Sequence, residues 1–284
     1  MTSSAHTKFI QELSAWETLK EHLRLYWQFT AISLRGQMQY RASFIMLVFG
    51  NLFSTAIEFV GIMALFARFG NLRGWRLSEI ALFYGMVGIA FALAEGIGRG
   101  FDLFPNLIKS GDFDRLLLRP RSTVFQVAAQ ELQLMRVGRL AQACVVLVWA
   151  LGHIRTEWTL PRVILLLLSI LGGTCLFYGL FVLQATMAFW SVESLEIMNT
   201  VTYGGTETAQ YPLSIYSPWF RRFFTFVIPL ACINYLPSRV LLPHSPAAGP
   251  VWAAWLAPFV GMAFLFVTLQ TWNIGVRHYR STGS

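Results

Sequence analysis

Long apolar stretches separated by short polar ones make up most of the chain after its first 43 residues. A membrane-spanning helix needs about 20 consecutive apolar residues. Six stretches meet or approach that length, at residues 44–67, 80–98, 137–154, 163–190, 223–236 and 252–276. The fifth is only about 14 residues long and contains Pro229, so a broken or re-entrant segment is an alternative there. The pattern predicts an all-α polytopic membrane protein with six transmembrane helices.

The first 43 residues are more polar and contain no apolar stretch long enough for a signal peptide. Ser14 and Glu17 have the spacing of a capping box at a helix start. Apolar side chains then recur at helical spacing, namely Trp16, Leu19, Leu23, Tyr26, Trp27 and Leu34. We expect an amphipathic helix on the inner membrane surface, serving either as an anchor or as a contact for a partner. The predicted organisation is a cytoplasmic tail with this interface helix (1–43), a six-helix transmembrane domain (44–276) and a cytoplasmic tail (277–284).

Composition agrees with a membrane protein: 55% of the residues are hydrophobic and the mean hydropathy is +0.53. The net charge of +8 comes from basic residues scattered between apolar stretches, which fits membrane topology better than nucleic-acid binding. With a cytoplasmic N-terminus, six of the 22 basic residues fall outside, namely Arg68, Arg73, Arg76, Arg155, Arg162 and Arg239. The other sixteen, Arg221 and Arg222 among them, fall inside. This imbalance predicts that both termini are cytoplasmic.

The connection between the second and third predicted spans, residues 99–136, is rich in charged residues. Asp102 can cap a short helix that has Pro105 in its first turn and stops at Gly111. Asp112 can cap a second short helix that ends before Pro120. Such a pair would present an apolar ridge surrounded by charges to a groove of another protein. The alternative is a loop on the membrane surface whose charges meet water and lipid headgroups.

No motif in the chain predicts catalysis. It has no phosphate-binding G-x-x-x-x-G-K-[ST], no H-E-x-x-H and no G-x-S-x-G, and its three cysteines lack metal-ligand spacing. We therefore expect a chain with no catalytic residue, cofactor or metal of its own. Glu58 and Glu95 lie within predicted spans, where a carboxylate must face a cavity or a polar partner. Both are candidates for a substrate path, and a purely structural, hydrogen-bonded role is equally open.

Two stretches carry a resemblance to a known family, "LIKSGDFDRLLLRPRSTVFQV" at 107–127 and "YPLSIYSPWFRRFFTFVIPLACINYLP" at 211–237. With the amphipathic helix and six spans, they resemble the permease subunit of type-2 ATP-binding-cassette (ABC) exporters over residues 25–279. The resemblance is closest to a subgroup with the loop G-[DE]-[FL]-D-x-L-L-L-R-P after the second span. Here that loop runs from Gly111 to Pro120.

The resemblance implies a half-transporter in a bacterial inner membrane, paired with an identical or related permease and with cytoplasmic ABC ATPase subunits that carry ATP and Mg. Residues 101–119 would be the helix that couples to the ATPase. Its apolar contacts would be Phe101, Phe104, Leu107 and Ile108, and its rim contacts Asp112, Asp114, Arg115 and Arg119. The stretch at 211–237 would lead to the fifth span and help form an external gate.

ATP-driven export of a hydrophobic or amphiphilic substrate is therefore the leading function. A gradient-driven carrier that uses Glu58 and Glu95 is the alternative, and a membrane scaffold without transport is the third.

Overall fold

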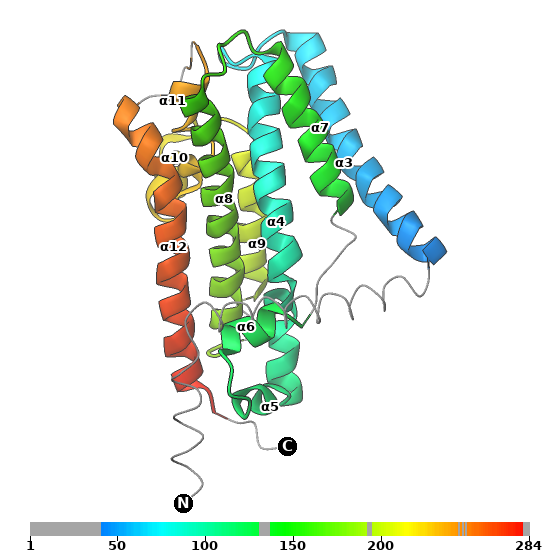
Figure 1. Cartoon of the computed structure of the whole chain (residues 1–284), viewed down its shortest axis with the longest axis vertical. Helices are drawn as coiled ribbons and strands as arrows, with labels where there is room; N and C mark the ends of the chain where they lie inside the picture. Colours follow the sequence, from blue (N-terminus) through cyan, green and yellow to red (C-terminus); the bar gives the residue numbers. More distant parts are fainter. Residues whose placement is uncertain are drawn as a thin grey trace, which may run out of the picture.

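The computed structural model describes residues 41–130, 137–191, 195–243, 245, 247 and 249–280. It is mostly helical, and the long helices lie side by side in an elongated bundle (Figure 1). The predicted N-terminal interface helix lies outside the described residues. Residues 41–43 already belong to the first long helix.

Five of the six predicted spans correspond to helices. They are α3 (Arg41–Phe69), α4 (Leu77–Ser110), α7 (Val137–His153), α8 (Leu160–Met187) and α12 (Val251–His278). Of the described helices, four are long and apolar enough to cross a membrane, namely α3, α4, α8 and α12. α7 is apolar but shorter, with 17 residues. α3, α4, α7 and α8 run in alternating directions along the bundle, and α12 runs in the same direction as α8 (Figure 1).

The predicted fifth span at residues 223–236 is wrong as a continuous helix, and the alternative of a broken segment is confirmed. Its place in the bundle is taken by α9 (Leu195–Ala209), which lies beside α8 and α4 (Figure 1). The chain then folds into short pieces: η2 (Leu213–Ile215), α10 (Pro218–Phe226), η3 (Leu230–Cys232) and α11 (Ser238–Leu241). Pro229 separates α10 from η3, because proline lacks the N–H that would continue a helix. The hydropathy pattern missed α9 because four threonines, Asn199 and Glu207 interrupt its apolar residues.

The bundle has two distinct ends. The α5 end holds α5 (Phe113–Leu117), α6 (Thr123–Ala128) and the last turn of α12, and the opposite, α10 end holds α10 and α11 (Figure 1). Residues 211–217 are fixed to the connection between α3 and α4, since Trp75 Nε1 donates to Ser214 Oγ at 3.1 Å. Arg221 and Arg222 therefore lie at the α10 end. Their predicted position on the same side as the 99–136 connection is wrong. The difference in the number of basic residues between the two sides of the membrane is therefore smaller than predicted.

Small residues let the helix backbones approach closely. α8 crosses α12 at Gly172 and Gly261, where a Cβ on Gly172 would lie 2.8 Å from the Pro258 Cα. α4 meets α7 in the same way, because a Cβ on Gly88 would lie 2.8 Å from the Ala143 Cβ. Between membrane helices, where lipid removes most of the hydrophobic driving force, such close packing is a main source of association.

Gly172→Ala should therefore lower the thermal midpoint of the purified protein in detergent. The added methyl group must push α12 away, and overpacking of this kind costs about 1–3 kcal/mol. Gly61→Ala is the matched control, because nothing lies within 4 Å of a Cβ at that position of α3. A Gly172→Ala protein as stable as the control would show that the contact between α8 and α12 is not tight.

Candidate functional site

The hairpin at the α5 end begins with an unbroken helix. α4 runs for 34 residues through Asp102 and Pro105 to Ser110, so Asp102 does not cap a separate short helix as predicted. The predicted stop at Gly111 is confirmed, since this residue has the left-handed φ of 74° that favours glycine. Because α4 is continuous, the turn at Gly111 is attached directly to a membrane-spanning helix.

α5 is a single short helix that is tied to α6. Asp112 precedes it, as predicted, but the Asp112 side chain makes no capping hydrogen bond. It pairs instead with Arg115, whose Nη1 lies 3.3 Å from Asp112 Oδ1. Gln126 of α6 donates from Nε2 to the carbonyl oxygens of Leu116 and Arg121, at 3.0 and 2.9 Å. The two short helices therefore form one unit.

Aromatic rings in edge-to-face and tilted contacts hold this unit against the bundle. We call them the aromatic cluster, which consists of Phe101, Phe104, Phe113, Phe189, Trp272 and Tyr279. Phe104 of α4 lies with its ring centroid 5.1 Å from Phe113 of α5 and 4.8 Å from Trp272 of α12. Trp272 Nε1 also donates to Thr123 Oγ1 of α6 at 2.9 Å. Aromatic pairs at such distances stabilise beyond their buried area, so the cluster joins α4, α5, α6 and α12.

The predicted apolar docking ridge needs correction. Phe101 and Phe104 are fully buried in the aromatic cluster, and Ile108 is 8% exposed. None of the three can enter a groove of another protein unless the hairpin unfolds. The apolar residues that the hairpin does expose are Leu117 and Leu118, at 42% and 87%.

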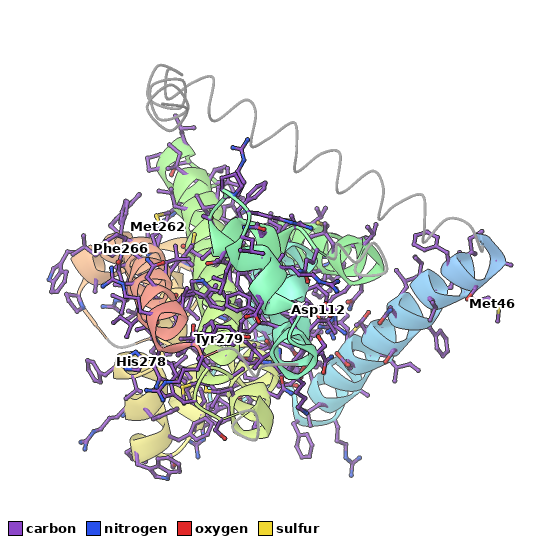
Figure 2. The ribbon with its side chains drawn as sticks, turned by 90° about the horizontal axis from the view of Figure 1, so that it is seen from below. Met46, Asp112, Met262, Phe266, His278 and Tyr279 are labelled. Atoms are coloured by element: carbon purple, nitrogen blue, oxygen red, sulfur yellow. The ribbon has the colours of Figure 1, made fainter. Side chains whose placement is uncertain are left out.

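The predicted rim charges surround these two leucines. Arg115 and Arg119 are exposed, and Asp112 and Asp114 are half-buried. Figure 2 looks onto this end and shows Asp112 near the middle of the bundle. The Asp114 carboxylate also faces Tyr279, and burial together with this carboxylate raises the pKa of the Tyr279 hydroxyl. The hairpin thus exposes an apolar tip of two leucines with charges around it.

Farther along the bundle, charged side chains are buried between α4, α7, α8 and α9. Asp102 accepts hydrogen bonds from Arg99 Nη1 at 2.7 Å, Tyr203 Oη at 2.9 Å and Gln184 Nε2 at 3.2 Å. Glu95 is fully buried, and its Oε2 lies 3.7 Å from Arg139 Nη1. We call these six residues the polar core. A buried charge is tolerated only when it is paired, so the core fixes how the four helices meet.

Sequence analysis identified Glu95 but not its basic partner. Arg99 and Arg139 are among the sixteen basic residues that the charge pattern predicts on the inner side of the membrane. In a helix that continues past Arg99, the spacing of Glu95, Arg99 and Asp102 puts all three on one face. This spacing was the feature of the sequence that could have identified the polar core.

Glu58 belongs to a different environment from Glu95. It lies on the exposed side of α3, where its Oε2 accepts from the Tyr84 hydroxyl at 3.4 Å. Glu207 of α9, which sequence analysis did not single out, is also exposed and interacts electrostatically with Glu58 and Arg139. We call Glu58, Arg139 and Glu207 the charged face. Arg139 connects it to the polar core through Glu95.

The described residues contain no group of three or more His, Cys, Asp or Glu side chains that could hold a metal ion.

Comparison with known proteins identifies the family. Residues 52–283, which include every element described above except the start of α3, match the model of the ABC-2 family transporter proteins. The chain belongs to this family. It is therefore an ABC transporter permease, a multi-pass membrane component of a family that works with ABC ATPase subunits. No curated protein and no solved structure matches the chain. The resemblance is confirmed at the level of the family, and the subgroup with the G-D-F-D loop stays a prediction.

The aromatic cluster leads to a test of how the hairpin is held. Phe113→Ala should free α5 from α4 and α12, because removing a fully buried phenylalanine ring costs about 3–5 kcal/mol. We expect faster proteolytic cleavage between residues 110 and 130, measured by limited digestion and mass spectrometry. Leu118→Ala, which removes an exposed side chain, is the control and should digest like the original protein. Equal cleavage of all three proteins would contradict the proposed anchoring.

The polar core leads to a test of charge pairing. Glu95→Ala should lower the thermal midpoint strongly, because breaking a buried ion pair leaves Arg139 without its carboxylate and costs about 3 kcal/mol or more. Replacing both residues by leucine should restore much of the loss. Glu58→Ala is the control, since Glu58 is exposed. If Glu95→Ala melts at the same temperature as Glu58→Ala, the pair does not stabilise the bundle.

Proposed function

We propose that this permease is one half of an ATP-driven exporter. It pairs with a second permease, identical or related, and with cytoplasmic ATPase subunits that carry ATP and Mg. The complex moves a hydrophobic or amphiphilic substrate outward across a bacterial inner membrane, with both termini of this chain in the cytoplasm. The observation that carries the proposal is the hairpin at the α5 end, which offers an exposed apolar tip on a firmly packed base.

The tip supplies the contact with the ATPase. Leu117 and Leu118 are large apolar side chains in water at the end of the bundle, an arrangement that is typical of a surface that another protein covers. Arg115, Arg119 and Asp112 around them would give polar rim contacts, which set orientation more than affinity. Of the residues first expected to dock directly, Phe101, Phe104 and Ile108 act behind the tip by fixing its position, with Leu107 partly buried beside them.

Motion of the tip has a direct route into the membrane. α4 extends without a break from the hairpin to Leu77 at the α10 end. The aromatic cluster fastens α5 to α4, to Phe189 two residues after α8 and to Tyr279 at the end of α12, so a displacement of α5 on ATPase closure would tilt these helices together. Rigid-body movements of packed helices are a standard means of switching between two states.

The charged face supports a substrate path. Glu58 and Glu207 lie on exposed sides of α3, which is long and apolar enough to cross a membrane, and of α9, which packs beside α4 and α8. Ionised groups at that depth need a polar partner or a water-filled cavity. A second permease packed against this side would enclose such a cavity, and a cationic amphiphile would pair with the two carboxylates. Unchanged export of cationic cargo by Glu58→Gln would remove Glu58 from the path.

Gradient-driven transport is the second candidate. The pairs Glu95–Arg139 and Arg99–Asp102 favour it, because paired charges inside a membrane protein are typical of proton relays. Family membership favours the ATP-driven function. The two candidates differ in whether the purified complex contains an ATPase.

The test is affinity purification of the full chain from its native membrane in mild detergent, followed by assay of ATP hydrolysis. We expect an ATPase to copurify, and Leu118→Asp to reduce the bound ATPase about tenfold or more, as expected when a buried interface residue becomes charged. Leu160→Asp is the matched control, because Leu160 is 73% exposed and lies at the far end of the bundle. Purification of the chain alone, with transport that follows a proton gradient without ATP, would establish the carrier instead.

A further inference from the structure

An apolar groove lies on the outer surface of the bundle between α12 and the broken segment that contains α10 and η3. Its volume is about 670 Å³. One wall is formed by α12 from Trp252 to Val267, and the other by residues of the broken segment such as Phe226 and Cys232. The groove exists because Pro229 interrupts the helix there, so the segment does not pack along the full length of α12.

The groove continues into a smaller pocket with a positively charged rim. The two share Thr225, Phe226 and Leu236, and the smaller pocket, of about 310 Å³, is also lined by Arg221 and Arg222. Both arginines are exposed, and neither forms an ion pair with any of the residues that the structure describes. No Asp or Glu follows Glu207 in the chain, so no carboxylate comes from the groove's own segments. Two arginines that are neighbours in sequence thus line the pocket that adjoins the apolar groove.

We propose that this groove binds an anionic phospholipid. The phosphate would be held by Arg221 and Arg222, since guanidinium groups bind phosphate oxygens in a bidentate manner. One acyl chain would lie along α12. Fifteen residues separate Trp252 from Val267, which is about 22 Å of helix and more than the hydrocarbon depth of one leaflet.

The charge of the groove's rim favours an anionic lipid over a second copy of the chain or a zwitterionic lipid. A second copy of this chain would bring the same two arginines, or another surface of a chain with net charge +8, against them. A zwitterionic lipid would fill the apolar groove but would leave the excess positive charge unbalanced. An anionic lipid satisfies both the apolar wall and the arginines, and basic pockets between membrane helices are a known form of lipid recognition. Which leaflet supplies the lipid depends on the proposed orientation of the chain in the membrane. The binding of the lipid does not depend on that orientation.

The experiment is reconstitution of the full chain into nanodiscs that contain equal amounts of phosphatidylglycerol and phosphatidylcholine. After gentle re-extraction, native mass spectrometry counts the lipids that remain bound. We expect retained phosphatidylglycerol to exceed phosphatidylcholine about tenfold, and Arg221→Gln with Arg222→Gln to remove this preference. The matched control is Arg68→Gln with Arg155→Gln, which removes two exposed arginines at the same end of the bundle and should keep the preference.

A second pair of variants tests the groove apart from the charge. Ala263→Phe would fill the groove and should reduce retained lipid of both kinds, whereas Ala64→Phe on the exposed side of α3 should not. Equal thermal midpoints would verify that all variants are folded.

Three results would overturn the proposal. In the first, the variant with both Arg221→Gln and Arg222→Gln keeps its preference for phosphatidylglycerol. In the second, the control arginine pair loses the preference equally, which would indicate a general surface-charge effect. In the third, millimolar inorganic phosphate releases the lipid completely, which would indicate a site for free phosphate. These outcomes are independent of whether an ATPase copurifies.

Discussion

The free-energy cost of placing charge in apolar surroundings determines how the helices gather around α4. Glu95 and Asp102 lie on one face of this helix, and their partners Arg139 and Tyr203 come from α7 and α9. A carboxylate taken from water into this environment without such partners would cost several kcal/mol. The polar core therefore selects one arrangement of α4, α7, α8 and α9. The close glycine contacts then let the backbones reach the separation which that arrangement requires.

The two ends of the bundle use aromatic residues in different ways. At the α5 end, the aromatic cluster has four fully buried rings and links the hairpin to segments that come from distant parts of the chain. At the α10 end, Trp219 and Phe226 remain 70% and 81% exposed on a short helix that proline interrupts. The first end is packed as one body with α4. The second presents apolar surface to its surroundings, beside arginines that have no carboxylate nearby in the sequence.

The three proposed functions fall on separate surfaces of one chain. The hairpin tip lies at the α5 end, the charged face consists of residues from α3, α7 and α9, and the groove lies between α12 and the segment with α10 and η3. Figure 2 shows Phe266 of α12 at the edge of the bundle. α4 links the hairpin tip to the charged face, because it carries the hairpin at its end and Glu95, the partner of Arg139, in its middle. The groove lies away from α4, on the last helix.

The sequence by itself determined the helical class, five of the long helices, the turn at Gly111 and the family. These depend on local properties, namely the length of apolar stretches and the backbone freedom of glycine. It misplaced the fifth span, because hydropathy cannot show that the polar helix α9 is stabilised by side chains from α4 and α8. It also assigned Phe101 and Phe104 to a surface that they do not occupy. Only tertiary packing decides which face of a helix is buried, since Trp272, the ring that both residues contact, lies more than 150 residues away along the chain.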